Sequence, residues 1–159
     1  YMAKDPVALA GEKRELPKVE FKPVDETTPQ FRNFHISNVY CNGAEKGIFV
    51  RGIPEMHVKD ILLENMVLQA DKGIDIQEAS GISLKNIKII SKETNPVVDI
   101  IQSDKLLFDQ ISYGDGTELL FRVSGDRSNG IRIKNTDASK ARQAIVYELG
   151  ATEKAVTRE

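Results

Sequence analysis

A short pattern of alternating residues recurs along this chain and constrains its fold more than any other feature. Apolar residues occupy its first and third positions and a side-chain amide its fifth, and the five copies start 27, 21, 24 and 25 residues apart. In the first four copies a second short alternation follows the amide at once, and a third apolar run follows after a gap. The copies occupy 34–38, 61–65, 82–86, 106–110 and 131–135.

Alternation with a period of two predicts β-strands that bury one face. Three such strands within 21 to 27 residues cannot enclose a core, so successive repeats must stack on one another. Stacked three-strand coils predict an all-β fold, a right-handed parallel β-helix of four to five coils. Apolar residues line its shaft and the alternate residues face water.

The amide of each repeat is expected to form the sharp bend between the first and second strands. Asparagine tolerates the left-handed backbone region that such a bend needs. Asn38, Asn65 and Asn86 are therefore expected to stack about 4.8 Å apart, with their side-chain amides bonded in a ladder. Gln110 tolerates the bend less well, and a local distortion is expected there.

The leucine-rich repeat is the main alternative, because its asparagines also stack. That repeat is dominated by leucine and places two residues between the last apolar position and the asparagine. In this chain one residue separates them, and isoleucine, valine, phenylalanine and methionine fill the apolar positions. The β-helix is the better interpretation.

The sequence divides into three parts around the repeat. Segment 1–33 lacks the period, contains four prolines and is expected to be a connecting lead-in, in which the alternation at 18–24 is compatible with an edge strand. The coils occupy 34–139. Segment 140–159 is expected to hold a last strand at 144–149 and a charged tail able to cap the final coil.

Charge and composition argue against several classes of function. Lys and Arg number 22 against 24 Asp and Glu, with no basic block, so no nucleic-acid partner is expected. The apolar runs are far shorter than the roughly 18 residues of a membrane span, so no membrane partner is expected. Cys41 has no second cysteine for a disulfide or a metal site and is expected to be a buried apolar residue; no cofactor is predicted.

The coils at 31–113, the lead-in YMAKDPVAL at 1–9 and the ending YELGA at 147–151 resemble the carboxy-terminal third of bacterial polygalacturonase-like glycoside hydrolases. Members of that family are right-handed parallel β-helices that hydrolyse galacturonate-containing pectic polysaccharides with inversion. The resemblance implies a secreted or periplasmic parent enzyme. The first residues contain no signal peptide, so either export is absent or its signal lies upstream. The partners that it implies are pectic polysaccharide or oligogalacturonide and the missing amino-terminal coils of the same protein. It also implies that Tyr1 lies beside the substrate cleft and touches sugar.

The family's catalytic strings do not occur here in their usual order, which is Asn-Thr-Asp, Asp-Asp, Gly-His-Gly and Arg-Ile-Lys. Arg132-Ile133-Lys134 precedes Asn135-Thr136-Asp137 in this chain, and the sequence contains no Asp-Asp and no Gly-His-Gly. The fifth repeat already accounts for 131–135. The resemblance therefore implies that the catalytic carboxylates lie upstream and that this chain alone is inactive.

The residues themselves offer few other candidates. Asp75 and Asp99 are expected at equivalent outward positions of adjacent coils, about 5 Å apart, which is closer to a retaining than an inverting glycosidase pair. The alternative is two solvated carboxylates on a charged face. His35 and His57 are expected to be exposed, without partners at metal spacing. Segment 125–130 predicts a turn and lacks the spacing of a phosphate loop.

Three functions remain open at this point. The favoured one is a catalytically incomplete part of a pectin-degrading hydrolase. The others are a free-standing β-helix that binds acidic glycans without cleaving them, and a structural solenoid that serves as an assembly surface. Without amino-terminal coils the first coil is expected to expose a strand edge whose backbone groups are unpaired. The chain is therefore expected to aggregate, dimerise or pair with its missing half.

Overall fold

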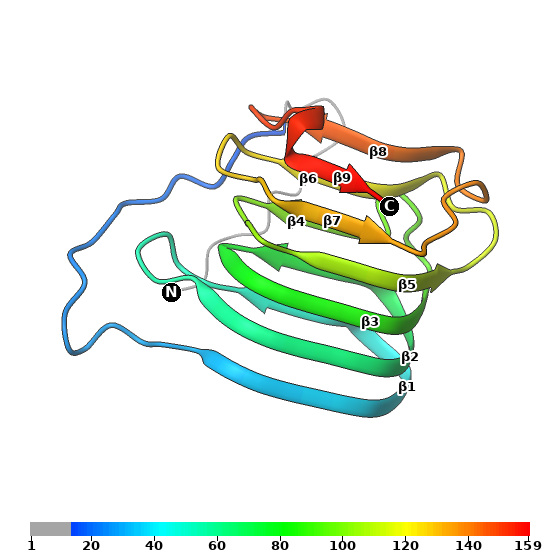
Figure 1. The fold of residues 1–159 in the computed structure, drawn as a ribbon, viewed down its shortest axis with the longest axis horizontal. Coiled ribbons are helices and arrows are strands. Elements are labelled where there is room, and N and C mark those ends of the chain that lie inside the picture. The colour runs from blue at the N-terminus through cyan, green and yellow to red at the C-terminus, as the bar shows by residue number, and fades with distance from the viewer. Residues whose placement is uncertain (1–13) are drawn as a thin grey trace.

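The computed structural model describes residues 14–159, and it confirms the parallel β-helix prediction (Figure 1). The chain winds through about five stacked turns, and each pair of neighbouring strands runs parallel. The elements are β1 (Arg32–Arg51), β2 (Val58–Gln77), β3 (Ala79–Ser91), β4 (Val98–Ile101), β5 (Leu107–Tyr113), β6 (Leu119–Ser124), β7 (Ile131–Lys134), β8 (Gln143–Glu148), the 3-10 helix η1 (Glu153–Ala155) and β9 (Val156–Arg158).

Two series of strands run up the molecule from β2. The first part of β2 pairs with β3, and the series continues through β5, β7 and β9. The last part of β2 pairs with β4, which is followed by β6 and β8. We call this second series, together with 46–51 of β1 and 72–77 of β2, the third-strand sheet, because it is built from the third strand of each repeat.

Inward-facing side chains stack in columns along the shaft. In the column used below, the members at the middle coils, Leu84 and Phe108, are fully buried. The ring of Phe108 also meets that of Phe121 edge-on, with centroids 5.1 Å apart. The middle coils are thus sealed by the coils above and below them, as the stacking argument requires. The column contains Ile36, Leu63, Leu84, Phe108 and Ile133.

The asparagine bends form as predicted. Asn38, Asn65 and Asn86 have φ values of 59°, 55° and 52°, in the left-handed region. The side-chain nitrogen of Asn86 donates a hydrogen bond of 2.9 Å to the side-chain oxygen of Asn65. The amide ladder is therefore confirmed between these two coils.

The distortion expected at Gln110 is absent from the backbone. Its φ of 56° matches that of the asparagines, because the coils on either side fix the path of the corner. The change is in the side chains instead, since Asn135 in the coil above donates to the carboxylate of Asp109 at 2.9 Å. The expectation was wrong for the backbone, and the substitution alters which side chains pair.

Two replacements of Asn65 separate the cost of the left-handed backbone conformation from the contribution of the side-chain hydrogen bond. Asn65→Ala is expected to lower the free energy of unfolding by about 1 to 2 kcal/mol, because alanine tolerates the left-handed region less well than asparagine and lacks the amide that accepts the hydrogen bond. Asn65→Gly removes the same bond but adopts this φ freely, so it is expected to be about 1 kcal/mol more stable than the alanine variant. Urea denaturation of both variants measures the difference. Equal losses would mean that the left-handed bend carries no cost at this corner.

Each of the two terminal segments differs in part from its prediction. The possible edge strand at 18–24 is wrong: the described lead-in forms no strand, and its prolines cannot donate to a sheet. It instead crosses the outside of the coils from the level of β8 down to β1 (Figure 1). At the other end β8 confirms the predicted last strand, but the tail also forms η1 and then β9, which pairs with β7. None of the helices among residues 14–159 has the length and apolar character to cross a membrane.

The two ends of the shaft are covered to different extents. At the carboxyl end, Ala155 of η1 is buried in the core, and half-buried Tyr147 and Val156 pack beside it. At the amino end, Phe34 and Ile36 of β1 are 48% and 47% exposed, and apolar side chains of β1 and β2 line a hollow of about 600 Å³. The shaft is therefore covered above β7 and open below β1.

Candidate functional site

A charged hollow of about 430 Å³ lies on the outer surface of the third-strand sheet. Its lining includes five cationic and three carboxylate side chains, an excess of positive charge on a chain whose net charge is −2. We call this hollow the cationic groove. The charged residues are Arg14, Lys46, Arg51, Lys72 and Arg122, with Asp75, Glu93 and Asp99.

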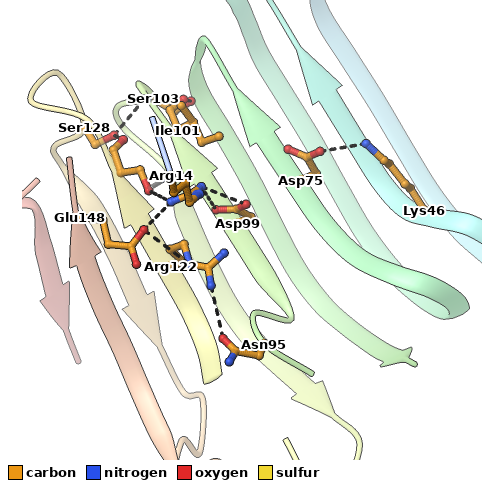
Figure 2. A network of polar contacts seen from close by, with 11 residues as sticks. Arg14, Lys46, Asp75, Asn95, Asp99, Ile101, Ser103, Arg122, Ser128 and Glu148 are labelled. Atoms are coloured by element: carbon orange, nitrogen blue, oxygen red, sulfur yellow. Dashed lines mark hydrogen bonds and ion pairs between the residues drawn. The ribbon is translucent and has the colours of Figure 1, made fainter. Parts of the chain in front are cut away.

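The structure brings Asp75 and Asp99 together as predicted, since they are direct register partners of β2 and β4. They are not simply solvated carboxylates, however, because each lies beside a cation (Figure 2). Lys46 Nζ is 3.0 Å from Asp75, and Arg14 Nη2 is 3.1 Å from Asp99. Each of the two carboxylates therefore has a cationic partner of its own.

Arg14 ties the lead-in to three strands of the third-strand sheet. Besides Asp99 of β4, its guanidinium donates to the Ser124 hydroxyl of β6 at 2.6 Å and to the Glu148 carboxylate of β8 at 2.6 Å (Figure 2). The Arg14 side chain is only 15% exposed. Sequence reasoning missed this residue, because the lead-in has no periodic pattern that points to its partners.

Burial raises the pKa of the Asp99 carboxyl above its ordinary value, and the guanidinium groups of Arg14 and Arg122 act against that rise. The raised pKa means that the ionised form of Asp99 is less favourable in the folded chain than in water. Asp99 therefore contributes stability below the unfolded value of 3.8, and this contribution is lost as the pH rises through the folded pKa.

Asp99→Asn is expected to remove this pH dependence. The stability of the variant relative to the native chain is expected to increase as the pH rises from about 3 to 7. In that interval the Asp99 carboxyl of the native chain loses its proton, whereas the amide of the variant has no proton to lose. Urea denaturation of both chains at pH 3, 5 and 7 measures the difference. A stability difference that stays constant with pH, or that moves in favour of the native chain, would contradict the raised pKa.

Arg122 lies where the cationic groove meets a second hollow of about 540 Å³ on the same sheet, and it lines both. Its side chain is 19% exposed, and its Nη2 donates to the Asn95 side chain at 3.3 Å. Its Nε is 3.8 Å from the Glu148 carboxylate and has no hydrogen-bond partner among residues 14–159. This guanidinium retains unused hydrogen-bonding capacity.

The two histidines have different surroundings. His35 is 57% exposed, as expected, and its Nε2 is 2.6 Å from Glu64. His57 is only 20% exposed, so the expectation of an exposed side chain is wrong there. Its Nε2 lies 3.1 Å from Glu78 and its Nδ1 4.0 Å from Asp104, because the turn after β1 folds it against the next two coils. Both rings face carboxylates.

Glu78 is the most buried acidic side chain among the described ion pairs, at 2% exposure. Arg127 donates two hydrogen bonds to its carboxylate, of 2.7 and 3.0 Å. The predicted turn at 125–130 is confirmed, and it carries Arg127 back across two coils. The ring of Phe21 from the lead-in lies 5.5 Å from the same guanidinium. We call Glu78, His57 and Arg127 the corner cluster.

The Arg-Ile-Lys string belongs to the fifth repeat and forms β7. Arg132 and Lys134 lie 3.1 and 2.8 Å from the carboxylate of Glu159, so they fasten the end of the chain. Hydrogen bonds from Lys134 and then Arg132 lower the pKa of that carboxyl. The interpretation of this string as a structural repeat is confirmed.

Of the remaining candidates, Cys41 is half-buried rather than fully buried, because it stands at the open end of the shaft. Tyr1 lies outside the described residues. Within 14–159 no group of three or more His, Cys, Asp or Glu side chains is arranged to hold a metal ion.

No protein-family model, curated protein or solved structure matches this chain.

Proposed function

We propose that the chain is the carboxy-terminal β-helix part of a pectin-degrading glycoside hydrolase, whose catalytic carboxylates lie on coils that stack against β1. In this proposal the described residues extend and stabilise the solenoid and contribute to its polysaccharide-binding surface. The parent enzyme hydrolyses galacturonate-containing polysaccharide, and the chain alone is inactive.

The open end of the shaft is the observation that carries the proposal. Phe34 and Ile36 occupy inward positions that are fully buried two coils further on, at Ile82 and Leu84 of β3, yet these two residues are 48% and 47% exposed. The 20-residue strand β1 also pairs through one edge only among the described strands, which leaves a long hydrogen-bonding edge beside the apolar hollow. A surface of this kind matches a further coil of the same construction.

The shape of the first coil favours a parallel coil over a second copy packed head to head. The corner at Asn38 is a single left-handed residue, whereas the next corner contains a register shift at Asn42 and Ala44. A two-fold rotation reverses the order of these unlike corners, so two copies cannot match both at once. A preceding coil of the same repeat keeps the order and matches both.

The ion pairs of the described residues are consistent with catalytic groups elsewhere. Asp75 and Asp99 are each paired with a cation, and His35 and His57 each face a carboxylate. An inverting hydrolase needs a free carboxylate pair about 6.5 to 9.5 Å apart with room for a water between them. The proposal therefore assigns that pair to the coils that cover β1.

Hydrolysis of polygalacturonate tests the proposal. The 159-residue chain and the same chain extended by the sequence that its gene encodes upstream are each incubated with polygalacturonate, and new reducing ends are counted. The extended protein is expected to release products of inverted anomeric configuration, visible by proton NMR, and the short chain none. An upstream sequence without coils, or an extended protein that leaves polygalacturonate intact, would overturn the proposal.

A further inference from the structure

We propose that the cationic groove binds the carboxylate of a uronic-acid unit, with Arg122 as its principal contact. This inference rests on the proposed function for the class of ligand, and on the third-strand sheet for the site. It assigns to this part of the chain a binding role that needs no catalytic residue.

Charge is the first argument for an acidic ligand. The groove gathers five cationic side chains against three carboxylates, and Asp75 and Asp99 are each already held by one of these cations. Among the remaining cations, Lys72 is 39% exposed, with its nearest carboxylate, Glu93, 4.0 Å away. A positive excess concentrated in one hollow of an acidic chain attracts anions to that hollow.

The incomplete hydrogen bonding of the Arg122 guanidinium is the second argument. A guanidinium offers five N–H donors in a planar fork that fits a carboxylate. In this protein the Nη2 contact to Asn95 is long, and the buried Nε has no partner among the described residues. Figure 2 shows one terminal nitrogen of Arg122 pointing away from both Asn95 and Glu148. A carboxylate bound in the groove supplies an acceptor for this outward-pointing terminal nitrogen.

The shape of the surface favours an oligosaccharide over a small anion. Arg122 and Asn95 line both the cationic groove and the second hollow, so a ligand spanning the two has Arg122 near its middle. The lining is mixed: the half-buried Pro96 presents apolar surface to the carbon face of a sugar ring, and the exposed Asn95 presents an amide to its hydroxyl groups. Volumes of about 430 and 540 Å³ lie in the range of small-molecule sites.

Calorimetry on the 159-residue chain with hexagalacturonate tests this inference. Saturable binding is expected, weakening as salt is added because the contact is ionic. The methyl ester of the same oligosaccharide has the same sugar skeleton without the negative charge, so its binding is expected to be at least tenfold weaker. Inorganic phosphate at the same concentration is expected not to displace hexagalacturonate, because it reaches only one of the two hollows.

Four variants test whether hexagalacturonate binds in the groove. Arg122→Gln is expected to weaken hexagalacturonate binding about tenfold or more, and Arg122→Lys by less, because lysine keeps the charge but lacks the fork. Lys72→Gln is expected to weaken it several-fold. Lys140→Gln is the matched control, since Lys140 lies 3.9 Å from Asp115, much as Lys72 lies 4.0 Å from Glu93, but outside both hollows. It is expected to leave binding unchanged.

The inference fails if hexagalacturonate does not bind, if the methyl ester binds equally well, if phosphate displaces the ligand, or if the Lys140 variant is as weak as the Arg122 variant. Circular dichroism checks that each variant is folded; should Arg122→Gln unfold, the exposed Lys72 decides the outcome. If hexagalacturonate does not bind in the groove but the extended protein hydrolyses polygalacturonate, this inference alone is rejected. Groove binding without hydrolysis by that protein would reject the proposed function alone.

Discussion

Leu84→Ala is expected to lower the free energy of unfolding by about 3 kcal/mol, whereas Ile36→Ala, in the same column of the shaft, is expected to cost about 1 kcal/mol. Leu84 is fully buried between two coils, so its truncation leaves a cavity. Ile36 is 47% exposed in the first coil, so its truncation removes fewer contacts and water fills the space. Urea denaturation of the two variants and the native chain provides the comparison.

This pair of variants also tests what covers the first coil. If the extended protein carries a coil below β1, the cost of Ile36→Ala is expected to rise there towards that of Leu84→Ala, because the side chain is then enclosed. The cost of Leu84→Ala is expected to stay the same in both proteins. A cost for Ile36→Ala that remains near 1 kcal/mol in the extended protein would mean that no coil packs against this position.

Arg127→Ala is expected to destabilise the fold by about 3 kcal/mol, because it leaves the carboxylate of Glu78 buried without its bidentate partner. The Glu78 side chain is 2% exposed, and His57 would then be its one remaining charged partner among residues 14–159. Glu78→Gln is expected to cost less, because the Arg127 side chain is 35% exposed and water can solvate it. The double variant is expected to be more stable than Arg127→Ala alone, since it buries no charge. Denaturation of the native chain and the three variants forms a double-mutant cycle.

Phe21→Ala is the control for the remaining contact of Arg127. Removal of the ring 5.5 Å from the guanidinium is expected to cost about 0.5 to 1 kcal/mol, the usual size of a cation–π contact near the surface.

The double-mutant cycle has two outcomes that would contradict this account. If Glu78→Gln proves as costly as Arg127→Ala, or if the double variant is no more stable than Arg127→Ala, the buried charge is not what makes the corner cluster sensitive.

The repeat carried enough information for the architecture. Alternation with a period of two fixed which residues face the shaft, and the position of the amide marked the corner of each coil, because few residues adopt a positive φ without strain. The same reasoning predicted that Asp75 and Asp99 would be neighbours and that Arg132 and Lys134 belong to a strand. These features all depend on spacing along the chain, which a sequence displays directly.

The contacts that the sequence did not predict connect distant residues without a shared period. Arg14 reaches Glu148 across 134 positions, and Arg127 reaches Glu78 across 49. The path of the lead-in decides the first pair and the fold of a turn decides the second, and neither is encoded in an alternating pattern. The position of Arg122 in its strand was predictable, but its unused donors depend on where Asn95 and Glu148 lie.

Hydrogen exchange along β1 is the most direct test of the claim that further coils cover the open end of the shaft. Backbone amides of β1 and β2 are compared in the 159-residue chain and in the protein extended by its upstream coding sequence. In the extended protein the β1 amides are expected to become as protected as those of β2, because their free edge is then paired, while β2 changes little. Exchange from β1 that is equally fast in both proteins would contradict the claim.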